Sequence, residues 1–152
     1  MHPLAARPSD KGFTLIEVIL VVAMISVIVI PLLISYRTTR TNQALLSSTE
    51  EFANHVRSAH IFARDANGRK NWGVRSTDAK RYEIYSAIGG TSSPENRYSL
   101  EPAVQFTNSF DVLFQIGTGE TDAELQILFS ADNGSKAKVE VLKTGVVEVV
   151  PI

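Results

Sequence analysis

The N-terminal part of the chain is organised by one long apolar run. Residues 13–34 make up 22 positions, and Glu17 is the only one of them that can carry a charge. Roughly 20 apolar residues are enough for a helix to cross the hydrocarbon core of a bilayer. The run therefore predicts a membrane-spanning helix over residues 13–35. Pro31 lies near its end and should kink or locally loosen that helix.

A second helical pattern follows the apolar run. Residues 35–43 are polar, but from there on apolar and small residues recur every three or four positions, at Leu45, Thr49, Phe52, Val56, Ala59 and Ala63. This spacing puts them on one stripe of a helix, which another element must cover. Asn67 and Gly68 form a helix stop signal. Residues 36–67 are thus predicted to continue the first helix as its amphipathic half.

Beyond residue 68 the apolar positions alternate with polar ones, as they do in half-buried strands. The candidate strands are residues 72–75, 81–87, 97–100, 104–107, 110–116, 124–130, 136–143 and 146–150. Short turn sequences separate the later strands and favour an antiparallel meander, whereas residues 89–96 and 117–122 read as irregular loops. The pattern predicts an α+β fold, in which the long N-terminal helix packs on an antiparallel β-sheet head of residues 68–152.

Composition adds little to this picture. The chain has 152 residues, enough for one domain and an anchor, and a formal net charge of −1. This balance argues against nucleic acid as a partner. The chain has no cysteine, so no disulfide can stabilise the head.

Glu17 is the unusual residue of the apolar run. A carboxylate within lipid is unfavourable by a few kcal/mol unless another group compensates it. A cation at the same depth would offset this penalty. The terminal ammonium of a chain that begins at Phe13 would supply such a cation.

The residues around Glu17 resemble a known motif. Lys11 and Gly12, followed by Phe13-Thr14-Leu15-Ile16-Glu17, closely resemble the class III signal of type IV prepilins and type II secretion pseudopilins. The resemblance implies that residues 1–12 are a leader, and that a prepilin peptidase cleaves between Gly12 and Phe13 and methylates the new amino group of Phe13. It also implies that Glu17 pairs with the terminal amine of a neighbouring subunit, a contact that sets register more than it adds net stability. The competing interpretation is an ordinary signal anchor with a chance glutamate.

The same resemblance implies a structural subunit and not an enzyme. It would be a pseudopilin or minor pilin that assembles into a type II secretion pseudopilus or a type IV pilus. Its expected partners are the prepilin peptidase, other pilin or pseudopilin subunits, an inner-membrane assembly platform and membrane lipid. The subunit would cross the bacterial inner membrane once, with a cytoplasmic N-terminus and a periplasmic head, before it enters the filament.

The rest of the chain resembles one branch of this family. Residues 52–64, with the turn and β-rich region after them, look like the head of H-type minor pseudopilins and related minor pilins. Many major type IV pilins close a C-terminal loop with a disulfide, and the absence of cysteine departs from them.

Motifs for catalysis or metal binding are absent from the sequence. It has no nucleophile elbow, no His-Glu-x-x-His and no phosphate loop. His55 and His60 lie on different sides of the helix, and His2 lies in the leader, so no histidine metal site is expected. Glu120, Asp122 and Asp132 lack the spacing of an EF-hand, which favours a solvated acidic loop over a calcium site. No cofactor is indicated.

Charge is unevenly distributed along the head. Basic residues dominate residues 64–81, whereas residues 111–132 contain five carboxylates and no basic residue. Complementary patches of this kind could steer contacts between subunits. Alternatively, the head of a minor pilin could bind DNA or another ligand, with Arg69, Lys70 and Arg75 on the phosphates and Trp72 stacked on a base.

Overall fold

We describe the protein from a computed structural model, which covers residues 12–151. Residues 1–37 and residues 38–152 form two separate compact units, which we treat individually. Most of the predicted leader, residues 1–11, lies outside the described residues.

Helix α1 (Leu15–Arg64) begins in the first unit and ends in the second. Within the first unit every large apolar side chain from Phe13 to Tyr36 is exposed. By length and composition this helix is apolar enough to cross a membrane, with a mean hydropathy of 3.1 over its most apolar window. The helix is assigned without interruption through Pro31, so the loosening predicted there is not seen.

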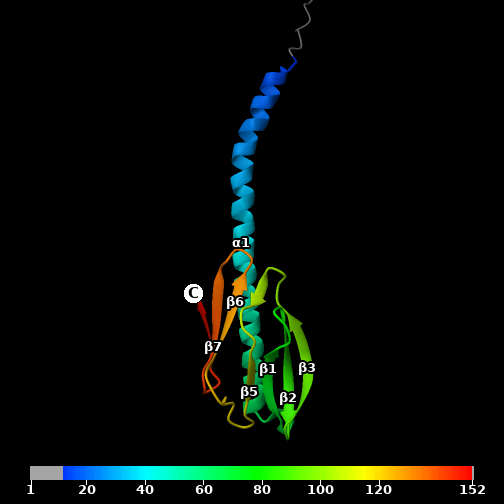
Figure 1. Cartoon of the computed structure of the whole chain (residues 1–152), viewed down its shortest axis with the longest axis vertical. Helices are drawn as coiled ribbons and strands as arrows, with labels where there is room; N and C mark the ends of the chain where they lie inside the picture. Colours follow the sequence, from blue (N-terminus) through cyan, green and yellow to red (C-terminus); the bar gives the residue numbers. More distant parts are fainter. Residues whose placement is uncertain (1–11, 152) are drawn as a thin grey trace, which may run out of the picture. The chain divides into compact units, whose positions relative to one another are not determined.

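The second unit contains eight strands, which pair into two antiparallel sheets (Figure 1). Sheet A has the order β3-β2-β1-β5, and its strands are β1 (Asn71–Ser76), β2 (Arg81–Ile88), β3 (Thr91–Ser99) and β5 (Asp111–Phe114). Sheet B has the order β4-β6-β7-β8, and its strands are β4 (Val104–Phe106), β6 (Leu125–Ala131), β7 (Lys136–Val141) and β8 (Val147–Pro151). The head is therefore not one continuous meander.

The chain changes sheets between β4 and β5, and side chains fasten this crossover to both sheets. Asn108 donates from Nδ2 to the Gln126 carbonyl at 3.0 Å and accepts from the Leu128 N–H at 2.9 Å. On the other side, the Ser76 hydroxyl accepts from the Phe110 N–H at 3.0 Å. Together with the backbone bonds from the Thr107 N–H to the Leu128 carbonyl and from the Ser76 N–H to the Phe110 carbonyl, they tie the crossover to both sheets.

Two predicted boundaries were wrong. Most of the loop expected at residues 89–96 belongs to β3, a polar and mostly exposed edge strand that is placed by its pairing with β2 rather than by apolar alternation. The helix ends at Arg64, three residues before the expected end at 67. Ala66 then adopts a left-handed conformation with φ 52°, and Asn67–Arg69 form a short 3-10 helix, η1.

The core lies between α1 and the two sheets. The predicted stripe of the helix is buried in full, from Leu45 to Ala63. Phe52 is its centre, because its ring makes edge contacts with four other rings, those of Tyr82, Phe106, Phe110 and Phe129. Both sheets contribute to this aromatic cluster, so it joins the crossover, the helix and the two sheets into one core.

Candidate functional site

Gly12 and Phe13 precede the helix and are both exposed. The Phe13 side chain is 85% exposed, and a Cβ added at Gly12 would meet no atom within 4 Å. The peptide bond between these two residues is therefore open to a protease within the described part of the chain.

The first turn of α1 is closed by a reciprocal pair of side chains. Thr14 precedes the first helical residue, and its hydroxyl accepts from the Glu17 N–H at 3.3 Å. The Glu17 carboxylate accepts through Oε2 from the Thr14 N–H and from the Thr14 hydroxyl, both at 3.0 Å. This is the capping box of a Thr-x-x-Glu sequence, and it satisfies two helix-terminal donors at once.

The capping box partly satisfies the hydrogen-bonding capacity of the Glu17 carboxylate within a single chain, although the surrounding segment is apolar. One carboxylate oxygen is satisfied locally, whereas Oε1 makes no hydrogen bond within residues 12–151. Glu17 therefore keeps an acceptor available for a cation from outside the chain. Thr14 was not predicted as part of this site, although its Thr-x-x-Glu spacing from Glu17 is a signal that could have identified it.

The residues considered for DNA contact do not form one exposed patch. Lys70 pairs with Glu95 at 3.3 Å, and the Trp72 indole N–H donates to the Asn67 carbonyl at 3.0 Å while its ring packs 5.0 Å from Phe62. Arg69 is exposed and follows directly after Gly68 in η1. Because Lys70 and Trp72 already interact with other groups of the same chain, this region is not well suited to bind nucleic acid.

Arg75, the fourth of these residues, belongs to an ion-pair network on sheet A. Its guanidinium binds Oε1 of Glu83 at 2.7 Å, and Arg97 binds Oε2 at 3.1 Å. Burial disfavours the Glu83 carboxylate, whose side chain is only 4% exposed, but the two arginines outweigh burial and hold its pKa below the ordinary value. Arg75 also lies 4.7 Å above the Tyr85 ring.

The two described histidines occupy different surroundings. His55 contacts the Tyr82 hydroxyl through Nδ1 at 2.7 Å and stacks on Tyr98 at 3.9 Å. His60 packs near Phe114 and is covered by Gly119 and Gly145, where an added Cβ would approach its ring to within 2.6 Å. Across residues 12–151 no group of three metal-binding side chains comes together.

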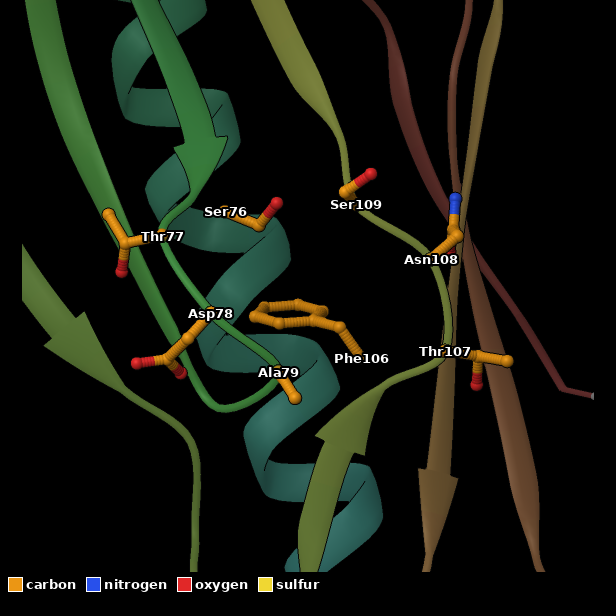
Figure 2. A pocket seen from close by; sticks show the side chains of 8 residues that line it. All are labelled: Ser76, Thr77, Asp78, Ala79, Phe106, Thr107, Asn108 and Ser109. Carbon is orange, nitrogen blue, oxygen red and sulfur yellow. The ribbon is translucent and has the colours of Figure 1, made fainter.

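A shallow pocket of roughly 320 Å³ lies beside the crossover. Figure 2 shows the Phe106 ring between the turn of residues 76–79 and the segment of residues 107–109, with mainly hydroxyl-bearing residues around it. Ser76 and Asn108 are already bonded to backbone groups, so these two residues serve the crossover itself.

Comparisons with known proteins agree with the N-terminal motif and with the fold described above. Residues 7–33 match the family model described as the prokaryotic N-terminal methylation motif. Comparison with curated protein sequences gives no match. The fold is similar to the crystal structure of the minor pseudopilin EpsH from the type II secretion system of Vibrio cholerae. The TM-score is 0.51 at 13% identity, over 73% of this chain and 95% of that chain.

The motif and the fold are those of pilin-like structural proteins and not of enzymes. The class III signal is present, and it implies processing by a prepilin peptidase and assembly with other pilins. The chain therefore carries the N-terminal methylation motif at its start and has the fold of a minor pseudopilin.

Proposed function

We propose that this chain is a pseudopilin or minor pilin, a structural subunit of a type II secretion pseudopilus or a type IV pilus. A prepilin peptidase would cleave it between Gly12 and Phe13 and methylate the new amine. The mature subunit would then leave the inner membrane, with its head on the periplasmic side, and enter a filament through helix packing.

The observation that carries this proposal is the state of Glu17. Its carboxylate is fixed in the capping box by Thr14, but Oε1 has no hydrogen-bond partner among the described residues, in a segment that is otherwise apolar and exposed. A fixed anion of this kind is suited to the terminal ammonium of a neighbouring subunit. The charge would then be compensated only in the assembly, which favours correct register.

The first test is the mass and N-terminal residue of the protein recovered from its native membrane. We expect a chain that begins at N-methylated Phe13. A chain that still begins at Met1, from cells with an active prepilin peptidase, would contradict the proposal.

Two substitutions then separate assembly from helix capping. Glu17→Ala should leave cleavage largely intact but lower filament incorporation by at least about a hundredfold, because removing one partner of a buried pair costs about 3–5 kcal/mol. Thr14→Val removes the hydroxyl of the capping box but keeps the carboxylate, so it should lower incorporation far less. Equal losses in the two variants would mean that Glu17 acts only as a helix cap.

A further inference from the structure

Strand β5 is the edge of sheet A opposite β3, and among the described strands it pairs only with β1. The Ser76 N–H donates to the Phe110 carbonyl at 3.0 Å, and the pairing of β1 with β5 continues in the same register, with Val74 opposite Val112. Because the ladder alternates, Val112 and Phe114 direct their backbone groups toward β1. The N–H and C=O groups of Asp111 and Leu113 therefore point away from the sheet.

The edges formed by β3 and β8 carry protective devices that the short edge strand β5 lacks. Strand β3 contains Pro94 and a register shift that leaves Glu95 unpaired, and β8 contains Pro151. Proline and bulges are the usual devices that prevent a further strand from pairing with an edge. Strand β5 has neither device and no lysine.

The free edge of β5 borders a groove of roughly 340 Å³. Its lining consists of Asp111, Val112 and Leu113 of β5, residues 121–125, and Tyr85. Leu113 and Leu125 are partly buried. The groove thus offers apolar contacts next to unpaired backbone groups, the two features that an added strand requires.

The groove is negatively charged, which favours a positively charged binding partner. Asp111, Asp122 and Glu124 line it, and no lysine, arginine or histidine occurs between Arg97 and Lys136. Asp111 accepts from the Tyr85 hydroxyl at 2.6 Å, and Asp122 accepts from Gln115 at 3.1 Å, so these two carboxylates are held in place. Arg75 is bound to Glu83 and also stands opposite Asp111 in the β1–β5 pairing, where its charge acts on Asp111. The uncompensated negative charge of the groove therefore lies mainly on Asp122 and Glu124.

We propose that the β5 edge is a docking site for an extended, positively charged segment of another protein, which binds by adding a strand to sheet A. Backbone hydrogen bonds to Asp111 and Leu113 would hold the segment, and basic side chains would face the three carboxylates. A second copy joined through the same edge is disfavoured, because it would bring these carboxylates against one another. The site is separate from the N-terminal segment, so it can be tested whether or not the chain enters a filament.

The test uses the full chain in detergent and a short labelled peptide of alternating lysine and valine, with a matched glutamate–valine peptide as control. Fluorescence anisotropy should show that the lysine peptide binds at least about tenfold more tightly, a difference of about 1.4 kcal/mol. Asp122→Asn combined with Glu124→Gln should remove most of this preference. Equal binding of both peptides, or no binding, would overturn the proposal.

Leu113→Pro tests the backbone contact. It removes an N–H that points away from β1, so the ladder within sheet A is kept while strand addition is blocked. We expect a loss of binding of about tenfold or more, against less than about threefold for Leu113→Ala, which keeps the N–H. If Leu113→Pro instead changes the oligomeric state of the chain and leaves peptide binding unaltered, the edge pairs with a second copy and the proposal is wrong.

Hydrogen exchange of the unsubstituted protein provides a measurement that does not depend on folding of the proline variant. The Leu113 amide should exchange rapidly in the free chain, because it is unpaired, and become protected when the lysine peptide is bound. Unchanged exchange at Leu113 under saturating peptide would exclude strand addition at β5.

Discussion

At the scale of single residues, Gly73 is a position of sheet A where a side chain has no room. An added Cβ would lie 2.6 Å from Cζ of Tyr85 and 2.6 Å from the Val112 carbonyl oxygen. The Tyr85 ring crosses β1 at this glycine, and its hydroxyl reaches Asp111 on β5. Glycine here thus lets one tyrosine join two strands that are not neighbours.

We therefore expect Gly73→Ala to destabilise the head by about 1–3 kcal/mol, the usual effect of forcing a group into a packed site. Thermal unfolding followed by near-UV circular dichroism would measure it. Gln43→Ala, at an exposed helical position, is a suitable control. A Gly73→Ala variant as stable as the control would mean that the Tyr85 ring can move aside without penalty.

The histidines predict a pH dependence of stability. Burial lowers the pKa of His55, with partial opposition from Glu51, and burial with the charge of Arg64 lowers the pKa of His60. The unfolded chain therefore binds protons more readily than the folded one, and the free energy of unfolding should fall as pH drops through about 6.5. Denaturant titrations between about pH 7.5 and 5.5 would measure this slope.

The substitution His55→Gln should reduce that slope, and adding His60→Gln should reduce it further. The window lies above the range in which Glu83 and Glu95, whose pKa values are lowered, become protonated. A slope that is unchanged in the double variant would assign the pH dependence to other groups.

At the scale of elements, the turn between β6 and β7 is fastened to α1. Asn42 accepts at Oδ1 from Nδ2 of Asn133 at 2.7 Å and from the Ser135 hydroxyl at 2.9 Å. We expect Asn42→Ala to speed amide exchange at residues 132–135 and to lower global stability by no more than about 1–2 kcal/mol, since both bonds are exposed. Gln43→Ala is the matched control, and equal exchange in the two variants would show that the turn is rigid by itself.

Elements differ in how far the sequence predicts them. The stripe from Leu45 to Ala63 and the strands with apolar alternation were predictable, because burial of one face imposes their period. Strand β3 was not, because its exposed residues carry no such period and only pairing with β2 fixes it. The split into two sheets depends on Asn108 and Ser76 bonding to distant backbone groups, which no local pattern reveals.

The candidate sites divide in the same way. Gly12, Phe13 and Glu17 lie in one short motif, so the sequence alone pointed to them. The capping role of Thr14 was also encoded locally, in its spacing from Glu17. The groove at β5 joins residues that are distant in the chain, so the sequence indicated only its acidic character.

At the scale of the whole molecule, the core residues all come from the second unit. No residue from 12 to 44 is fully buried, and the core begins at Leu45. The apolar side chains of residues 13–34 are exposed within their own unit, and by length and composition this segment is suited to a membrane, in which lipid would cover them. The stability of the head should accordingly be independent of this segment.

A fragment of residues 38–152 should therefore fold alone, with a Tm within about 4–8 °C of the head transition in the full chain, which corresponds to about 1 kcal/mol. A fragment that starts at residue 53 is the contrasting case. It lacks Leu45 and Phe52, and loss of a buried Phe alone costs about 3–5 kcal/mol. We expect this shorter fragment to be unfolded. If the longer fragment also lost its near-UV signal, the membrane segment would stabilise the head directly, and the two units would not be energetically separate.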